Sequence, residues 1–153
     1  MILISFGTRP EYIKVKPLLD AFKGNIDYKL LLVGQHTDLL SDVTEEYISV
    51  SVEDGPNRLD SIVSSLLNND DIFEGVDAVL VQGDTTSALS LALAAFHRQK
   101  KIIHLEAGLR TYDLDNPYPE EFNRQAISRM SSINLCPTLE SHDNLAAEKV
   151  PGA

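Results

Sequence analysis

The sequence lacks the features that define several large classes of protein. Its 153 residues include a single cysteine, Cys136, and no tryptophan. One cysteine excludes an internal disulfide framework and a zinc site built from several thiolates. The longest apolar runs fall far short of the ~18 residues that span a bilayer, and no basic segment precedes the first of them. We therefore expect a protein of the cytoplasm with no membrane partner.

Positive charge is scarce as well. Lys and Arg together number 13 against 23 Asp and Glu, which gives a net charge of −10. Proteins that hold nucleic acid by bulk electrostatics carry the opposite balance of charge. We therefore expect no nucleic-acid partner, and any anionic ligand must be held by a few focused cations.

The common glycine-rich nucleotide motifs are missing. The chain contains neither a Gly-x-Gly-x-x-Gly turn nor a Gly-x-x-x-x-Gly-Lys loop. The first motif places a dinucleotide on a helix N-terminus, and the second cradles the phosphates of ATP or GTP. The sequence therefore carries no signature of an NAD site or a P-loop.

What the sequence does contain is an alternation of short apolar runs and segments with helical periodicity. The apolar runs predict strands at residues 2–6, 28–33, 78–82, 102–106 and 133–136, with 48–52 as a further short strand. The segments between them predict helices at 11–23, 38–47, 58–67, 87–98, 120–130 and 140–149. Strands that are apolar on both sides indicate a parallel sheet between two layers of helices. We therefore predict one α/β, Rossmann-like domain over residues 1–153.

Ligands of such a sheet bind beyond the carboxyl ends of its strands. The loops predicted there hold Gly7-Thr8-Arg9-Pro10-Glu11, Gly34-Gln35-His36, Gly83-Asp84-Thr85-Thr86-Ser87 and Ala107-Gly108-Leu109-Arg110. Three of the six arginines, Arg9, Arg110 and Arg124, fall in or just after these loops. With Lys14 close behind and helix N-termini that attract anions, the pattern favours a phosphate-bearing ligand. The alternative is that Arg9 and Lys14 are ordinary surface charges.

Carboxylates gather at the same edge of the predicted sheet. Glu106 closes one apolar strand, and Asp84 follows another. A carboxylate in such a place is costly unless it is paired or functional, and neighbouring carboxylates with different pKa values suit acid–base catalysis. Structural explanations remain open: Asp84 can cap the following helix, and Glu106 can pair with Arg110. Glu120 can pair with Arg124 one helical turn later.

Four side chains also have the chemistry of metal ligands: His36, Asp84, His104 and Glu106. Nitrogen and oxygen donors of these types bind several divalent metals. They come from separate loops, and no histidine pair has the His-x-x-x-His spacing of one helix face. We therefore predict no metal site.

Taken together, five motifs resemble those of the UDP-N-acetylglucosamine 2-epimerases, in particular the non-hydrolysing bacterial branch. The motifs are Gly7-Thr8-Arg9-Pro10-Glu11 with Ile13-Lys14, Gly34-Gln35-His36, Gln82-Gly83-Asp84-Thr85-Thr86, His104-Leu105-Glu106-Ala107-Gly108-Leu109-Arg110-Thr111, and Pro119-Glu120-Glu121-x-Asn123-Arg124. The resemblance implies that this chain is the N-terminal half of a GT-B-like, two-domain architecture. The C-terminal nucleotide-binding domain of that architecture would then be absent from residues 1–153.

The resemblance also implies an activity. It is the interconversion of UDP-N-acetylglucosamine and UDP-N-acetylmannosamine for surface polysaccharide, through elimination and re-addition of UDP at a 2-acetamidoglucal. The resemblance implies catalytic roles for Asp84, Glu106 and Glu120. It implies substrate binding by Arg9, Lys14 and Arg110. Because a proton rather than a hydride moves, no cofactor is implied.

Further expectations follow from the same family. An allosteric pocket would include Gln35, His36 and Arg58, and the domain would form a homodimer. Because most of the uridine-diphosphate contacts and a functional histidine belong to the second domain of the family, residues 1–153 alone are expected to be inactive. The alternatives are an epimerase or hydrolysing epimerase for a related UDP-2-acetamido sugar, and a non-catalytic dimerising fragment.

Overall fold

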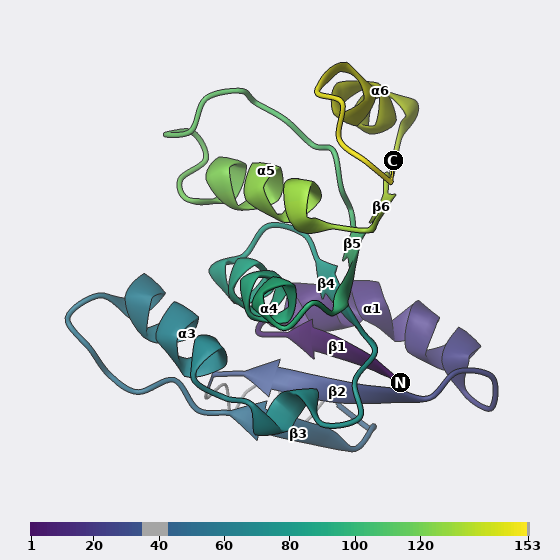
Figure 1. Cartoon of the computed structure of the whole chain (residues 1–153), viewed down its shortest axis with the longest axis vertical. Coiled ribbons are helices and arrows are strands. Elements are labelled where there is room, and N and C mark those ends of the chain that lie inside the picture. The colour runs from purple at the N-terminus through teal and green to yellow at the C-terminus, as the bar shows by residue number, and fades with distance from the viewer. Residues whose placement is uncertain (35–42, 153) are drawn as a thin grey trace.

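A six-stranded parallel sheet organises the chain in a computed structural model that describes residues 1–34 and 43–152 (Figure 1). Its strands are β1 (Ile2–Phe6), β2 (Tyr28–Val33), β3 (Tyr47–Val50), β4 (Ala78–Gln82), β5 (Lys101–Leu105) and β6 (Ile133–Leu135). They lie in the order β3-β2-β1-β4-β5-β6, and every neighbouring pair is parallel. The helices are α1 (Arg9–Phe22), α3 (Arg58–Leu67), η1 (Asp71–Phe73), α4 (Thr86–His97), α5 (Glu120–Met130) and α6 (Leu139–Ala147).

The sheet is covered on both faces because its strands are apolar on both sides. Leu30 and Leu32 of β2 pack with α1 on one face, whereas Leu31 and Val33 pack with α3, α4 and α5 on the other. All four side chains are at most 3% exposed. Figure 1 shows α1 and α4 on opposite sides of the central strands. The prediction of a Rossmann-like α/β domain is therefore confirmed.

The predicted elements differ from the observed ones mainly at one place. The predicted helix at 38–47 falls partly outside the described residues, and its described part, 43–47, is not helical. Tyr47 instead begins β3, whose register pairs Tyr47 with Leu30 and Val50 with Val33. Pairing with β2 satisfies the backbone hydrogen bonds of this aromatic and β-branched segment. The strand predicted at 48–52 is therefore confirmed, but it runs from 47 to 50.

The remaining elements agree closely with the predictions. Three strands and two helices have the predicted bounds, and β5 and β6 differ by one residue at their ends. The longest helix, α1, has 14 residues, and in the described part of the chain no helix has the length and apolar character needed to cross a membrane. Because the strands are parallel, the loops after β1, β4 and β5 meet at one edge of the sheet.

Candidate active site

One buried carboxylate joins two loops at the carboxyl edge of the sheet. Thr8 caps α1 and accepts from the Glu11 N–H at 3.4 Å, while Glu11 Oε2 accepts from the Gly7 N–H and the Thr8 hydroxyl, each at 2.9 Å. This arrangement is a variant of the capping box, in which the Gly7 N–H replaces the N–H of the capping residue itself. Glu11 Oε1 accepts from the hydroxyl of Thr85, the cap of α4, at 2.8 Å. Sequence reasoning assigned no role to Glu11, although its Thr-x-x-Glu spacing was the signal for such a box.

Glu106 lies at the centre of this edge. It directly follows β5 with φ at +67°, and Lys14 Nζ lies 3.0 Å and 2.7 Å from its two carboxylate oxygens. The Gln82 amide at the end of β4 also donates to Glu106 Oε2. A Cβ added to Gly83 would lie 3.6 Å from Glu106 Oε2, so this carboxylate packs against the turn that leads into Asp84. The structure thus brings together Lys14 and Glu106.

Arg110 points elsewhere. Its fully buried side chain donates from Nε and Nη2 to the two carboxylate oxygens of Glu148, at 2.7 and 3.1 Å. Such a bidentate pair ties the loop after β5 to the end of α6. The alternative that Glu106 pairs with Arg110 is therefore wrong. A substrate-binding role for Arg110 stays a prediction.

Asp84 is held against α5. Asp84 Oδ2 lies 2.6 Å from Arg124 Nη2, and the Asn123 side chain donates to the Asp84 carbonyl oxygen at 2.8 Å. The cap of α4 is Thr85, whose hydroxyl accepts from the Ala88 N–H, so the alternative that Asp84 caps this helix is wrong.

Arg124 is the partner that the predicted site residues did not include. Its guanidinium contacts Asp84, and its Nε lies 3.6 Å from Glu121. Among the ion pairs of the described residues, Arg124 therefore pairs with these two carboxylates and not with Glu120 one turn earlier. The i,i+4 explanation of Glu120 is thus wrong. Its position just after a loop at this edge was the signal that pointed to Arg124.

The three predicted catalytic carboxylates lie close enough to influence one another. Burial is the largest cause that raises the pKa of Asp84, and the negative charges of Glu120 and Glu106 raise it further. The charge of Arg124 opposes these effects without cancelling them. Asp84 therefore lies in surroundings that favour its protonated form, which is a common property of acid–base groups in active sites.

Glu121 anchors the loop that leads to Glu120. Its fully buried carboxylate accepts from the Thr111 and Tyr112 N–H groups, each at 3.0 Å, and from Gln125 at 2.7 Å. Although burial opposes it, these hydrogen bonds hold the pKa of Glu121 below its usual value. Residues 111–112 are thereby tied to the first turn of α5, which places Glu120 at its start.

A pocket of about 270 Å³ opens beside Glu120. Thr8, Arg58 and Thr85, at the N-terminal ends of α1, α3 and α4, line it. Helix N-termini present unpaired N–H groups and partial positive charge, so their convergence with an arginine suits an anion. Arg58 lines this pocket, whereas Gln35 and His36 lie outside the described residues, so the allosteric pocket stays a prediction.

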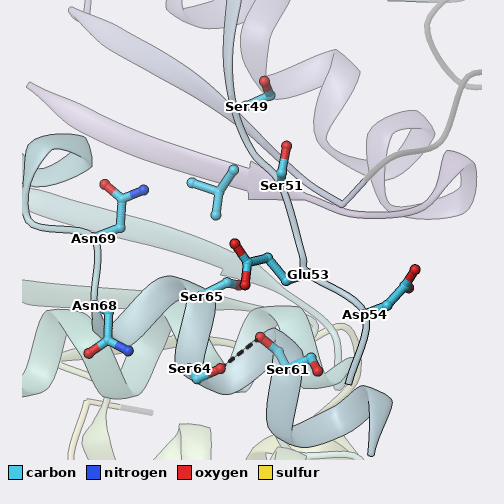
Figure 2. Close-up of a pocket in the computed structure, with 10 residues that line it drawn as sticks. Ser49, Ser51, Glu53, Asp54, Ser61, Ser64, Ser65, Asn68 and Asn69 are labelled. Atoms are coloured by element: carbon cyan, nitrogen blue, oxygen red, sulfur yellow. Dashed lines mark hydrogen bonds between the residues drawn. The ribbon is translucent and has the colours of Figure 1, made fainter. Parts of the chain in front are cut away.

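A second hollow, of about 440 Å³, lies between β3 and α3 (Figure 2). Serine and asparagine side chains line it together with Glu53 and Asp54. Its described lining contains neither a lysine nor an arginine, so the pocket beside Glu120 suits an anion better. Across residues 1–34 and 43–152, no group of three or more His, Cys, Asp and Glu side chains is arranged to hold a metal ion.

Comparison with known proteins identifies the family. The family model described as UDP-N-acetylglucosamine 2-epimerase matches residues 20–153. A UDP-N-acetylglucosamine 2-epimerase of Salmonella borreze is 38% identical over 97% of this chain and 42% of its own length. That of Neisseria meningitidis is 39% identical over 98% of this chain and 43% of its own length.

Solved structures agree with the sequence comparison. The crystal structure of the Neisseria meningitidis enzyme bound to UDP-GlcNAc has a TM-score of 0.89 at 36% identity, with 99% of this chain and 43% of that chain covered. A UDP-N-acetylglucosamine 2-epimerase structure from Listeria monocytogenes, described as putative, has a TM-score of 0.88 at 35% identity over 97% of this chain and 42% of that one. The chain thus spans less than half the length of these relatives. Its fold is that of one Rossmann-like half of their GT-B-like architecture, as predicted. The motifs, the fold and the matches together show that this chain belongs to the UDP-N-acetylglucosamine 2-epimerase family.

Proposed function

We propose that this chain carries the acid–base groups of a UDP-N-acetylglucosamine 2-epimerase. The observation that supports this most strongly is the convergence of Asp84, Glu106 and Glu120 at one edge of the sheet, where the charges of the latter two raise the pKa of the first. Family membership supplies the substrate class, because a similar structure from Neisseria meningitidis is described as bound to UDP-GlcNAc.

The proposed reaction moves one proton and one diphosphate. A carboxylate removes the proton from C2, the C1–O bond to UDP breaks with its electron pair, and a C1=C2 double bond forms. A carboxylic acid on the other side then returns a proton to the opposite face of C2 while a UDP oxygen rebinds C1. General acid–base catalysis of this kind requires groups that exchange protons near neutral pH. The raised pKa of Asp84 suits such an exchange.

Cations complete the proposal. Lys14 contacts Glu106, and Arg9 is the first residue of α1, the helix that also carries Lys14. We propose that both support the departing diphosphate, since preorganised positive charge stabilises a leaving anion. Arg58, at the pocket beside Glu120, is proposed for a second, regulatory nucleotide. Arg110 remains proposed as a substrate contact, although Glu148 holds it in this structure.

The relatives are more than twice as long as the part matched here. We propose that residues 1–153 form the N-terminal domain of such an enzyme and that a second domain supplies most of the contacts to uridine diphosphate. A homodimer through this domain is part of the same proposal. It follows that residues 1–153 alone should turn over substrate poorly or not at all.

Proton NMR in heavy water tests the proposal. The chain alone, and the chain fused to the unmatched part of the Neisseria meningitidis relative, are incubated with UDP-N-acetylglucosamine. We expect the fusion to introduce deuterium at C2 and to form the manno nucleotide, and the chain alone to be silent. Free N-acetylmannosamine as main product would move the chain to the hydrolysing alternative.

Two controls keep this test decisive. The unmatched part of the relative, expressed by itself, must show no exchange at C2. If the folded fusion also leaves C2 unexchanged in UDP-N-acetylglucosamine and in related UDP-2-acetamido sugars, the catalytic proposal is overturned and the dimerising fragment remains. Sedimentation of the chain alone then measures whether it forms the proposed dimer.

A further inference from the structure

We propose that His104 is a positioning residue that holds Asp84 in place by binding the carbonyl oxygen of Gly83. The inference rests on the proposed function, because it concerns how one of the proposed acid–base groups is oriented. His104 lies on β5, two residues before Glu106, and its side chain is 0% exposed. It is thus a buried titratable group for which the proposed reaction has no step.

The hydrogen bond of His104 has one possible direction. His104 Nε2 lies 2.7 Å from the Gly83 carbonyl oxygen, and a carbonyl oxygen only accepts, so Nε2 carries the proton. Burial is the main cause that lowers the pKa of His104 to about 4. The ring is therefore neutral near neutral pH, and its single N–H is used in this bond. Donating this proton to a substrate would require breaking the bond to Gly83.

Both backbone polar groups of Gly83 bind residues of β5. Its N–H donates to the Leu105 carbonyl oxygen at 2.9 Å, and its carbonyl oxygen accepts from His104. Gly83 has φ at +71°, a left-handed conformation that glycine tolerates without strain. The next peptide is held too, because the Asn123 side chain donates to the Asp84 carbonyl oxygen. Asp84 is therefore clamped on both sides, by an imidazole before it and an amide after it.

The same imidazole also contacts the helix that carries the cation paired with Asp84. His104 Nδ1 lies 3.5 Å from the hydroxyl of Ser128, which is fully buried on α5 and donates to the Arg124 carbonyl oxygen at 2.8 Å. His104 thus lies between the turn that bears Asp84 and the turn that bears Arg124. The charged groups that face Asp84 are Arg124 and Glu120 of α5 and Glu106 after β5.

Removing the imidazole N–H should loosen this turn. A part-buried carbonyl oxygen without a donor costs free energy, which the chain recovers by turning the Gly83 peptide toward water. Asp84 would then lose burial, the largest cause of its raised pKa, and would shift from its present position. A small misplacement of an acid–base group lowers the rate of the chemical step far more than the affinity for substrate.

Three variants separate positioning from simple packing. His104→Leu fills the same space with an apolar side chain but removes the N–H that donates to the Gly83 carbonyl oxygen. His104→Gln places an amide N–H where the Nε2–H was. Ile102→Val, on the same face of β5 and also 0% exposed, perturbs the core without touching the turn.

The first readout is the titration of the Asp84 carboxyl carbon, followed by ¹³C NMR in the chain itself. We expect its pKa to fall toward the ordinary value in His104→Leu and to stay near the wild-type value in His104→Gln and Ile102→Val. An unchanged titration in folded His104→Leu would overturn the proposal. Because this readout needs no turnover, it stays decisive even if the epimerase proposal fails.

The second readout is turnover in the active fusion. We expect kcat of His104→Leu to fall at least about tenfold with KM nearly unchanged, and His104→Gln to recover most of the loss. If His104→Gln is folded and as slow as His104→Leu, His104 acts by more than donating to Gly83 and the proposal is overturned. Loss of turnover in Ile102→Val equal to that in His104→Leu would assign the effect to packing.

Discussion

Two partly buried carboxylates, Glu45 beside α1 and Asp84 after β4, have opposite electrostatic surroundings. The Glu45 side chain, only 7% exposed, accepts from the Tyr12 hydroxyl at 2.7 Å and from Lys16, and Lys23 Nζ lies 3.6 Å away. Although burial opposes them, the hydrogen bonds from Lys16 and Tyr12 lower the pKa of Glu45 to about 2. Glu45 is therefore held as a carboxylate.

Asp84 is the contrasting case. Arg124 Nη2 lies 2.6 Å from its Oδ2, and two further carboxylates, Glu106 and Glu120, lie near enough to raise its pKa. Burial disfavours the charged form of both Asp84 and Glu45, but only Glu45 has enough donors to reverse the effect. The difference teaches that burial alone does not make a carboxylate functional. An excess of negative charge around it marks Asp84 as a group able to hold a proton, whereas Glu45 is structural.

Charge-removing variants of the site should show the largest effect. Glu106→Gln and Asp84→Asn keep volume nearly constant but remove a proton-exchanging group, so turnover of the fusion should fall by about 10²–10⁴-fold. Glu45→Gln is the matched control, and its folded protein should turn over at the wild-type rate. Steady-state turnover of all three variants, measured in the fusion, tests this expectation. Wild-type turnover in Glu106→Gln would contradict a catalytic role.

Stability should respond in the opposite way. Glu45→Gln leaves the buried hydroxyl of Tyr12 and the Lys16 ammonium without their charged acceptor, and should lower the free energy of unfolding by about 1–3 kcal/mol. Asp84→Asn should change it far less, because it also relieves repulsion from Glu106 and Glu120. Urea unfolding at neutral pH measures both changes. Equal losses in the two variants would remove the contrast between the carboxylates.

The two carboxylates should also give stability opposite pH dependences. Glu45 ionises with a folded pKa of about 2 and an unfolded value of 4.5, so its contribution is fully present above pH 4.5 and is lost as the pH falls toward 2. Asp84 has a folded pKa above 3.8, so the native state binds the extra proton and stability falls as the pH rises through that folded pKa.

Unfolding measured as a function of pH checks this contrast. The stability difference between wild type and Glu45→Gln should shrink as the pH falls from about 5 to 2. The stability of Asp84→Asn relative to wild type should grow as the pH rises from 3.8 through the folded pKa of Asp84, and then level off. When both differences are taken as wild type minus variant, the Glu45→Gln difference should rise with pH and the Asp84→Asn difference should fall. If both rise or both fall, the contrast between the two carboxylates is wrong.

The smallest effect is expected at Arg9. Its removal takes away one of several positive groups proposed near the diphosphate, so Arg9→Ala should lower turnover of the fusion about tenfold. Arg129→Ala, on the exposed end of α5 away from Glu120, is the matched loss of an arginine and should be silent. A wild-type rate in Arg9→Ala would assign Arg9 to structure.

Most of the elements could be predicted from the sequence because their signals are local. The run 78–81 is apolar at every residue, and the segment 58–67 has a helical period that ends at Asn68. The helix predicted at 38–47 is wrong over its described part, 43–47, because Tyr47 pairs with Leu30 of β2 instead. Only the neighbouring strand decides that outcome.

The composition of the site was predictable, but its pairing was not. The positions of Asp84, Glu106 and Glu120 at strand ends and a helix start followed from the motifs. Arg124, by contrast, entered the prediction as a partner of Glu120 and proved to contact Asp84. A one-turn helical spacing is easy to read from sequence, whereas a contact between the β4 loop and α5 depends on how the helix packs.

The sequence by itself determined the α/β class, the family and the edge of the sheet at which the ionisable groups gather. Those properties follow from hydrophobic period, turn residues and motif order, which neighbouring residues carry. Only the tertiary structure decided which charge meets which. Lys14 reaches Glu106 across 92 residues and Arg110 reaches Glu148 across 38, and the packing of α1 and α6 against the sheet selects these partners. Because the energy of an ion pair depends on distance and burial, both of which arise on folding, no local pattern encodes it.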